Sequence, residues 1–411
     1  MLNIVAVAIL GTMIIDAGMN FIADMLNLKA IDKRLPDAFR GWYDPVQYEK
    51  SQAYLKVNTH FGWIVGSFDL LLLVVFWFGG GFAWLDDRVS RLGLPMVWSG
   101  LIYIGILLAI KSLLSLPFGV YATFVIEERF GFNQTSWQTY VKDRIKAAIL
   151  AVVLGTPLLA AVLAFFHYAG SGAWWYCWLA TVVFMLLVQY IAPTWIMPLF
   201  NRFEPLSEGG LRDAIFDYAR GIGFKIDNIF VMDGSRRSSK SNAFFTGFGR
   251  RRRIVLFDTL IQKHTVDELL SVLAHEMGHY KEKHILKNLL ISILQAGVMF
   301  YIMSFFISYK GLFEAFQVQQ VSVYAGLVFF GMLYAPLDGL MGMAVQALSR
   351  RHEYAADRFA VRTTGKRKAM IEALKKLSVH NLSNLRPHPF YVFLNYSHPP
   401  VLKRIEAIEK L

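Results

Sequence analysis

The chain has 411 residues, of which 55% are hydrophobic and 18% are charged. A soluble protein carries about a quarter charged residues. Here the apolar residues gather in runs of roughly 20, which is the length that a helix needs to cross a bilayer. The composition therefore excludes an ordinary soluble protein and predicts a polytopic membrane protein.

Seven segments have the length and composition of membrane spans. They lie near residues 3–24, 62–85, 97–125, 147–168, 173–198, 286–308 and 321–346. Connections 28–60 and 127–146 hold six and four Lys or Arg, whereas 86–96 holds two and 309–320 holds one. By the positive-inside rule the first two connections face the cytosol, and an odd number of spans puts the N-terminus on the opposite side.

The net charge is +12, and Arg250 to Arg253 form a basic run. Such a run could contact RNA, but basic residues beside membranes usually meet anionic lipid or solvent. The alternation of charge along the connections favours the membrane explanation, so we expect membrane lipid and no nucleic acid as a partner.

The chain divides into membrane and hydrophilic parts. We expect a mainly α-helical fold built from four parts: residues 1–198 with five membrane helices and cytosolic loops 28–60 and 127–146, a cytosolic region 199–285, membrane helices six and seven in 286–346, and a cytosolic region 347–411. The two hydrophilic regions share one side and can fold together. Strand-like sequences at 228–232, 241–248 and 253–257, rich in β-branched and aromatic residues, predict a small β-sheet.

A helix should begin near Thr265, because Thr265 and Glu268 form a capping-box pattern. This helix carries His275 and His279. No proline separates it from the sixth span, so we expect one long helix to carry both the histidines and a membrane crossing.

Residues 275–279 read His-Glu-Met-Gly-His, an HExxH motif. Four residues make slightly more than one helical turn, so both imidazoles project from one face and can bind one zinc ion. Glu276 lies beside that face, where it can take a proton from the attacking water. The alternative interpretation is a surface helix with two solvated histidines.

A catalytic zinc needs a third protein ligand and an open position. Glu353 and Asp357, four residues apart on a predicted helix after the seventh span, are suitable: one carboxylate can bind the metal while the other orients a ligand histidine. His352 is a rival ligand, but it points about 100° away from Glu353 on a helix, so only one of the two can face the site. An ordinary salt-bridged helix is the alternative for this segment.

Further blocks extend over nearly the whole chain. They include Lys50-Ser51-Gln52 with Tyr54, Val125 to Asn133 (VIEERFGFN), Pro198 to Asn201 (PLFN), Ser241 to Phe245 (SNAFF), Arg253 to Leu260 (RIVLFDTL), Glu353-Tyr354-x-Ala356-Asp357 and Tyr396 to Pro400 (YSHPP). Together with HExxH, they resemble the integral-membrane CaaX prenyl proteases, the sterile-mutant type of HExxH zinc endopeptidases called gluzincins.

This resemblance implies roles for single residues. It makes Glu353 the third zinc ligand. It makes Asp357 the residue that accepts a hydrogen bond from a ligand histidine. It places Asn242, Ala243 and Phe244 on an edge strand that pairs with substrate, a general mode of peptide binding. It implies that His398 stabilises the oxyanion and that Arg404 reaches the substrate or the site carboxylates. Without the resemblance, His398 reads as a turn residue and Arg404 as an exposed helix residue.

The family encloses a polar chamber within its seven transmembrane helices, and polar residues inside the predicted spans suit one. Asp16, Asn20 and Asp24 share one face of the first span, and Gln189 and Asp338 fall at similar depth. Charged residues in spans normally face an interior. Counting about 1.5 Å per residue places Asp69 and Lys111 at matching depths, so we expect an ion pair.

The sequence thus predicts a zinc metalloendopeptidase that carries one zinc ion and acts on peptides or C-terminally lipidated proteins. The alternatives are a membrane-protein quality-control protease with the same site, and a transporter with a structural metal site. The membrane would be the bacterial inner membrane or the endoplasmic reticulum, depending on the source, with the active site toward the cytosol. The sequence leaves the oligomeric state open and is compatible with a monomer.

Overall fold

The computed structural model describes residues 3–226, 228–246 and 253–411. Most of the basic run at 250–253, and the end of the predicted strand 241–248, lie outside the described residues. No statement about nucleic acid or lipid at the basic run follows from the structure.

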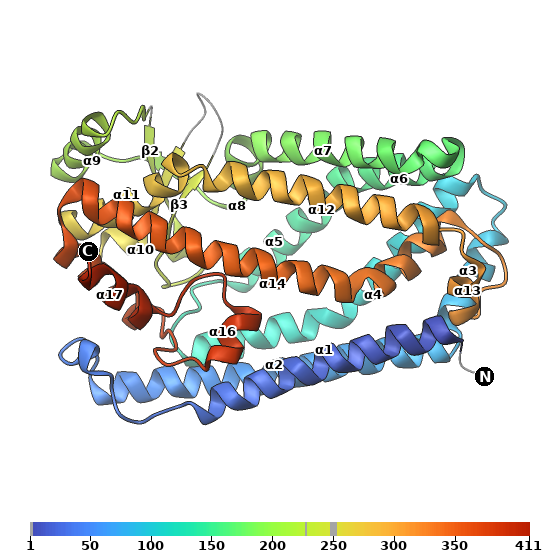
Figure 1. The fold of residues 1–411 in the computed structure, drawn as a ribbon, viewed down its shortest axis with the longest axis horizontal. Coiled ribbons are helices and arrows are strands. Elements are labelled where there is room, and N and C mark those ends of the chain that lie inside the picture. Colours follow the sequence, from blue (N-terminus) through green and yellow to red (C-terminus); the bar gives the residue numbers. More distant parts are fainter. Residues whose placement is uncertain (1–2, 227, 247–252) are drawn as a thin grey trace.

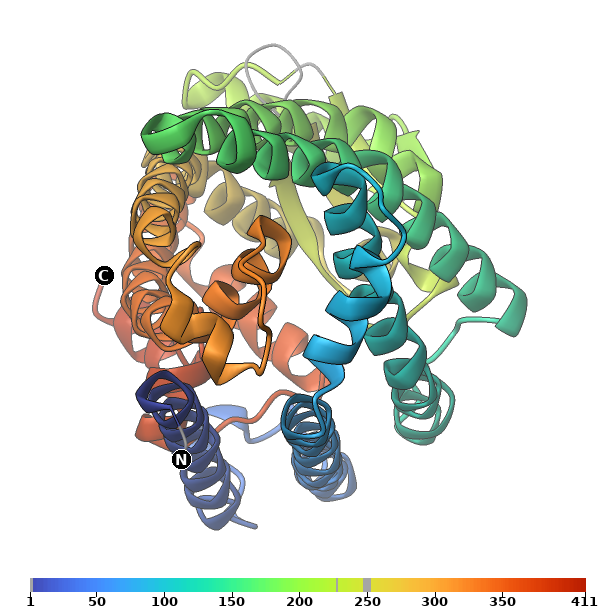
Figure 2. The ribbon, with the colours of Figure 1, turned by 90° about the vertical axis from the view of Figure 1, so that its right-hand side faces the viewer.

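Seven long helical segments are apolar enough to cross a membrane, as predicted. They are α1 (Ile4–Lys29), α2 (Pro45–Phe78), α4 (Met96–Tyr121) with a π turn to Glu127, α5 (Trp137–Leu150) continuing into α6 (Thr156–Tyr168), α7 (Ala173–Ile191) continuing to α8 (Met197–Phe200), α12 (His284–Phe306) and α14 (Val323–Thr364). Seen along the bundle, these helices form a ring (Figure 2). The N-terminus lies at one end of the ring, and the sheet and the C-terminus lie at the other (Figure 1).

The second span differs from the prediction. It begins at Pro45 and ends at Phe78, whereas residues 62–85 were expected. Asp44 caps it by accepting a hydrogen bond from the Gln47 N–H (2.9 Å), and proline suits the first helical position. Much of the expected loop 28–60 is therefore helix. After a break at Gly79 and Gly80, a separate helix α3 (Gly81–Ser90) follows.

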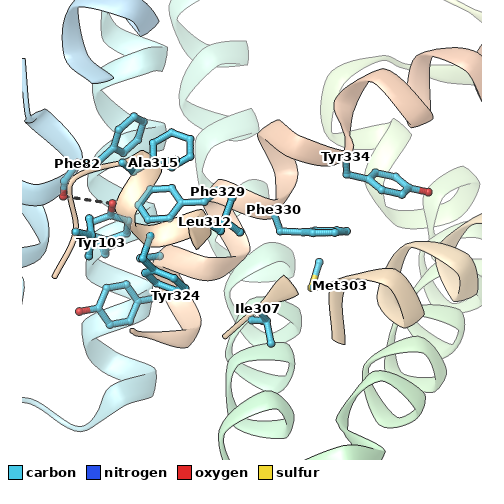
Figure 3. Close-up of a cluster of buried hydrophobic side chains, with 14 of the residues drawn as sticks. Phe82, Tyr103, Met303, Ile307, Leu312, Ala315, Tyr324, Phe329, Phe330 and Tyr334 are labelled. Carbon is cyan, nitrogen blue, oxygen red and sulfur yellow. Dashed lines mark hydrogen bonds between the residues drawn. The ribbon is translucent and has the colours of Figure 1, made fainter. Parts of the chain in front are cut away.

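Aromatic residues pack together at the end of the ring near the N-terminus. Helix α13 (Lys310–Ala315) lies in a connection where no element was predicted, and it crosses the ring together with α3 (Figure 2). Leu312 and Ala315 of this segment pack with Phe82 and Phe329 in a fully buried cluster (Figure 3). Burial of this apolar surface ties α2, α3 and α14 together.

The hydrophilic regions fold together at the opposite end, as predicted. Four strands, β1 (Phe203–Pro205), β2 (Asn228–Met232), β3 (Ala243–Thr246) and β4 (Arg253–Phe257), form a sheet in the order β1-β2-β4-β3, with β2 and β4 parallel and the other pairs antiparallel. The helices of these two regions are α9 (Gly210–Gly221), α10 (Asp258–Ile261), α11 (Val266–Lys281), α15 (Arg367–His380), α16 (Pro389–Asn395) and α17 (Val401–Glu409). Strands β2 and β4 match the predicted bounds, β3 begins two residues later than predicted, and β1 was not predicted.

Helix α11 begins as predicted, with a complete capping box at Thr265 and Glu268. It does not continue into the sixth span. The helix is interrupted at Glu282 and Lys283, and Lys283 adopts a left-handed conformation with φ of 58°. The expectation of one continuous helix was therefore wrong, because a single left-handed residue redirects the chain without any proline or glycine.

The predicted ion pair between Asp69 and Lys111 is present, with Nζ 2.5 Å from Oδ1. Ser115 accepts a second hydrogen bond from Lys111 at 3.1 Å. Asp24 also has a partner within the bundle, the Trp63 indole N–H at 2.8 Å. A wider layer that includes Asp16, Gln189 and Asp338 stays a prediction.

A charge swap tests the pair. Asp69→Lys and Lys111→Asp should each destabilise the protein, because each places two like charges between α2 and α4, whereas the double variant should recover most of the loss. We expect a coupling free energy of about 0.5–3 kcal/mol from unfolding of the four proteins in detergent. Additive losses would contradict a direct pair.

Candidate metal centre

Two helices from distant parts of the chain cross closely at the centre. On α11, Gly278 lies against Ala356 of α14, and a Cβ on Gly278 would come within 3.2 Å of the Ala356 Cα. Small residues on both sides let the two backbones approach. The crossing brings the HExxH turn of α11 next to the turn of α14 that carries Glu353 and Asp357.

The three expected ligands meet at this crossing. The Nε2 atoms of His275 and His279 are 3.1 Å apart, and Glu353 oxygens lie 3.5 Å from the first and 3.3 Å from the second. Tetrahedral bonds of about 2.1 Å to one zinc ion require ligand atoms about 3.4 Å apart. The donor set therefore fits a single zinc ion in both chemistry and spacing.

The environment of Glu353 supports the fit. Its Oε2 atom is buried and takes part in no hydrogen bond among the described residues, although Arg404 Nη1 lies 3.3 Å away. A buried carboxylate oxygen without a hydrogen bond is costly unless a cation compensates it. Burial lowers the pKa of His275, but contacts with Asp357 and Glu353 outweigh this and raise it to about 9. The site as a whole thus favours a positive charge between its carboxylates.

Asp357 and Arg404 lie on the Nδ1 side of the expected ligand His275. The Asp357 Oδ1 atom lies 2.8 Å from His275 Nδ1, so Nε2 faces the metal position. Arg404 donates two hydrogen bonds to Asp357, at 2.8 and 2.6 Å. Arg404 is thus not an exposed helix residue: it lies against the carboxylates of Asp357 and Glu353.

Glu276 and His398 lie around the same ligands. Glu276 is partly buried beside His275, and burial raises the pKa of its carboxyl, opposed by the neighbouring His275 and His279. His398 Nε2 lies 3.5 Å from a Glu353 oxygen, while two-thirds (66%) of its side chain is exposed. A carboxyl group and an imidazole thus lie beside the expected ligands, and the imidazole lies on the exposed side.

The predicted substrate strand is at an edge of the sheet. Ala243 and Phe244 belong to β3, which among the described residues has β4 as its one neighbouring strand and contacts α11, and Asn242 immediately precedes it. Asn381 holds the start of this segment through two hydrogen bonds with the Ser241 backbone, each of 3.2 Å. An edge strand next to a metal centre is suited to bind an extended peptide.

His352, the rival ligand, does not join the three ligands. It is buried, and its ring stacks on His284 with centroids 3.9 Å apart. The helical geometry that separates His352 from Glu353 accounts for this placement.

Comparison with known proteins shows the family. A profile described as "Peptidase family M48" matches residues 205–411, and one described as "CAAX prenyl protease N-terminal, five membrane helices" matches residues 24–202. The chain belongs to the CAAX prenyl protease branch of peptidase family M48. As an M48 peptidase of this branch, it is a multi-pass membrane metalloprotease, and the transporter alternative is set aside.

Relatives of this M48 peptidase cover most of its length. "CAAX prenyl protease 1 homolog" of Arabidopsis thaliana is 35% identical, over 91% of this chain and 90% of that protein. "CAAX prenyl protease 1" of Saccharomyces cerevisiae is 32% identical, over 93% and 90%. The crystal structure of S. mikatae Ste24p superposes with a TM-score of 0.90, 30% identity and 98% coverage of both chains.

Sequence reasoning missed two groups near the centre. Lys240, just before the edge strand, donates hydrogen bonds to Glu127 (2.8 Å) and Tyr54 (2.9 Å) of the membrane helices. Tyr54 and Glu127 both fall in the blocks that carry the family resemblance, which was the available signal. His284 contacts the ligand His279, and its place depends on the helix break that was not foreseen.

Gly278→Ala tests the close crossing. Gly→Ala in a helix usually stabilises by about 0.5–1 kcal/mol. Here the added methyl group must push α11 and α14 apart, so we expect a loss of about 1–3 kcal/mol and weaker metal binding. Thermal unfolding and bound metal per chain measure both effects. The matched control is Gly342→Ala on α14, where a Cβ meets nothing within 4 Å; equal behaviour of the two variants would refute the argument.

Proposed function

We propose that this M48 peptidase is a zinc endopeptidase in which His275, His279 and Glu353 hold one zinc ion. The observation that carries the proposal is the spacing of 3.1 to 3.5 Å between the donor atoms of these residues, drawn from two helices. Bound zinc supplies Lewis-acid polarisation of the scissile carbonyl and lowers the pKa of water.

The residues of the chain supply the proton transfer and the orientation. Glu276 accepts a proton from the attacking water and returns it to the leaving amine. The raised pKa of this carboxyl favours the first transfer, because a more basic carboxylate takes a proton from water more readily. His398, on the exposed side, donates a hydrogen bond to the developing oxyanion. Asp357 and Arg404 keep His275 in the orientation that leaves Nε2 free.

The substrate is proposed to be a peptide or a C-terminally lipidated protein. The relatives are named prenyl proteases, which supports a prenylated substrate. The edge strand β3 offers backbone groups to an extended chain, with Asn242 to Phe244 in contact with it. The ring of membrane helices, which contains the ion pair of Asp69 and Lys111, is proposed to enclose a polar chamber that receives the substrate, with the metal centre on the cytosolic side.

Removing the general base separates binding from chemistry. Glu276→Gln keeps the size of the side chain but cannot accept the proton, so we expect peptide cleavage to fall by about 10²–10⁴-fold. Zinc content should stay near one ion per chain, because Glu276 is not a proposed ligand. Cleavage of an internally quenched peptide and metal analysis of the same preparations measure the two quantities. Unchanged cleavage would remove Glu276 from the mechanism.

A matched pair of peptides tests the substrate class. One peptide carries a prenyl group on the cysteine fourth from its C-terminus, and the other has the same sequence without it. Burial of the added hydrocarbon should lower KM for the prenylated peptide by at least tenfold. Glu276→Gln, assayed on both peptides, controls for contaminating proteases. Equal kcat/KM for the two peptides would favour the broader quality-control alternative.

A further inference from the structure

The ligand His279 has a second contact that the proposed mechanism does not use. Its Nδ1 atom lies 3.0 Å from Nδ1 of His284, a distance that requires one proton between the two nitrogens. His284 is 3% exposed and therefore lies away from solvent. The two ligand histidines thus differ in their support: a carboxylate holds His275, and an imidazole holds His279.

The proton between His279 and His284 decides whether His279 can bind metal. A neutral imidazole carries a proton on one nitrogen and a lone pair on the other. If His279 Nδ1 donates to His284, its Nε2 lone pair faces Glu353 and His275. If His284 is the donor, a neutral His279 carries its proton on Nε2 and cannot bind. Only the first arrangement leaves His279 free to bind metal.

The position of His284 is built into the fold. The left-handed residue Lys283 ends α11 and starts α12, so that His284 turns back toward His279. The His352 ring stacks on His284 at 3.9 Å and an angle of 14°, and His352 directly precedes Glu353. Through this stacking contact, the residue that supports His279 packs against α14, the helix that carries Glu353.

We propose that His284 is a positioning residue that fixes the tautomer and ring orientation of the metal ligand His279, with His352 holding His284 in place by stacking. The inference rests on the proposed zinc site. Hydrogen-bonding partners of ligand histidines typically change metal affinity by about 10–100-fold when removed. His284 should act in this range without touching the metal or the substrate.

Four variants separate this role from simple packing. His284→Phe keeps a ring that can stack on His352 but has no acceptor. His284→Asn offers an oxygen acceptor near the position of Nδ1, and His284→Ala removes both features. His167→Phe, at an exposed position on α6, is the matched control.

Zinc affinity measured by competition with a chelator is the main readout, on purified full-length protein stripped of metal. We expect about 10–100-fold weaker binding for the Phe and Ala variants, substantial rescue for Asn, and no change for the control. The absorption spectrum of the cobalt-loaded proteins should change in the Phe variant and recover in the Asn variant. If the Phe variant does not fold, the comparison of Asn with Ala decides.

Two failures can be told apart. The proposed function would be contradicted if the wild-type protein bound no zinc, or if His275→Ala bound zinc as tightly as the wild type. Wild-type protein that binds zinc, together with a Phe variant of the same affinity or an Asn variant as weak as Ala, would overturn only the role of His284.

Discussion

The close crossing of α11 and α14 at Gly278 and Ala356 is the contact on which the centre depends. Zinc ligands must be held within a few tenths of an ångström, and flexible loops rarely do this. Here two histidines come from one helix and the carboxylate from another, so the distance between the two backbones sets the spacings between the carboxylate and both histidines. The remaining features of the fold keep this crossing in place.

The balance of charges at the crossing supports the proposed metal ion. Glu276, Glu353 and Asp357 bring three carboxylates to the centre, and Arg404 is the guanidinium in contact with two of them. With neutral histidines, two negative charges remain, and burying uncompensated charge is costly. A divalent cation cancels this excess. The same argument explains the contacts between Asp357 and Arg404: the guanidinium lets a carboxylate orient His275 without adding a further net charge.

Regular patterns made much of this structure predictable. The capping box at Thr265, the spacing of His275 and His279, and the strands at 228–232 and 253–257 all follow from local periodicity and side-chain chemistry. The third ligand was harder to predict. Spacing alone left Glu353 and His352 as rival candidates, and the family resemblance decided between them. The helix break at Lys283 had no local signal, because lysine is an ordinary helix former and yet adopts a left-handed conformation here. The position of His284 depends on that break, so it could not be predicted either. Similarly, α13 is too short for periodicity to identify, and its place is set by packing against Phe82 and Phe329.

The edge strand is positioned by the membrane helices as much as by the sheet. Just before it, Arg237 pairs with Asp143 of α5 (2.8 Å), and Lys240 pairs with Glu127 at the end of the α4 segment. Asn381 then fixes the Ser241 backbone from the C-terminal region. These contacts hold the segment that leads into β3 against both the membrane helices and the C-terminal region. A peptide that pairs with β3 would therefore meet the centre at a depth set by the membrane helices, which links the position of the cleaved bond to the bilayer.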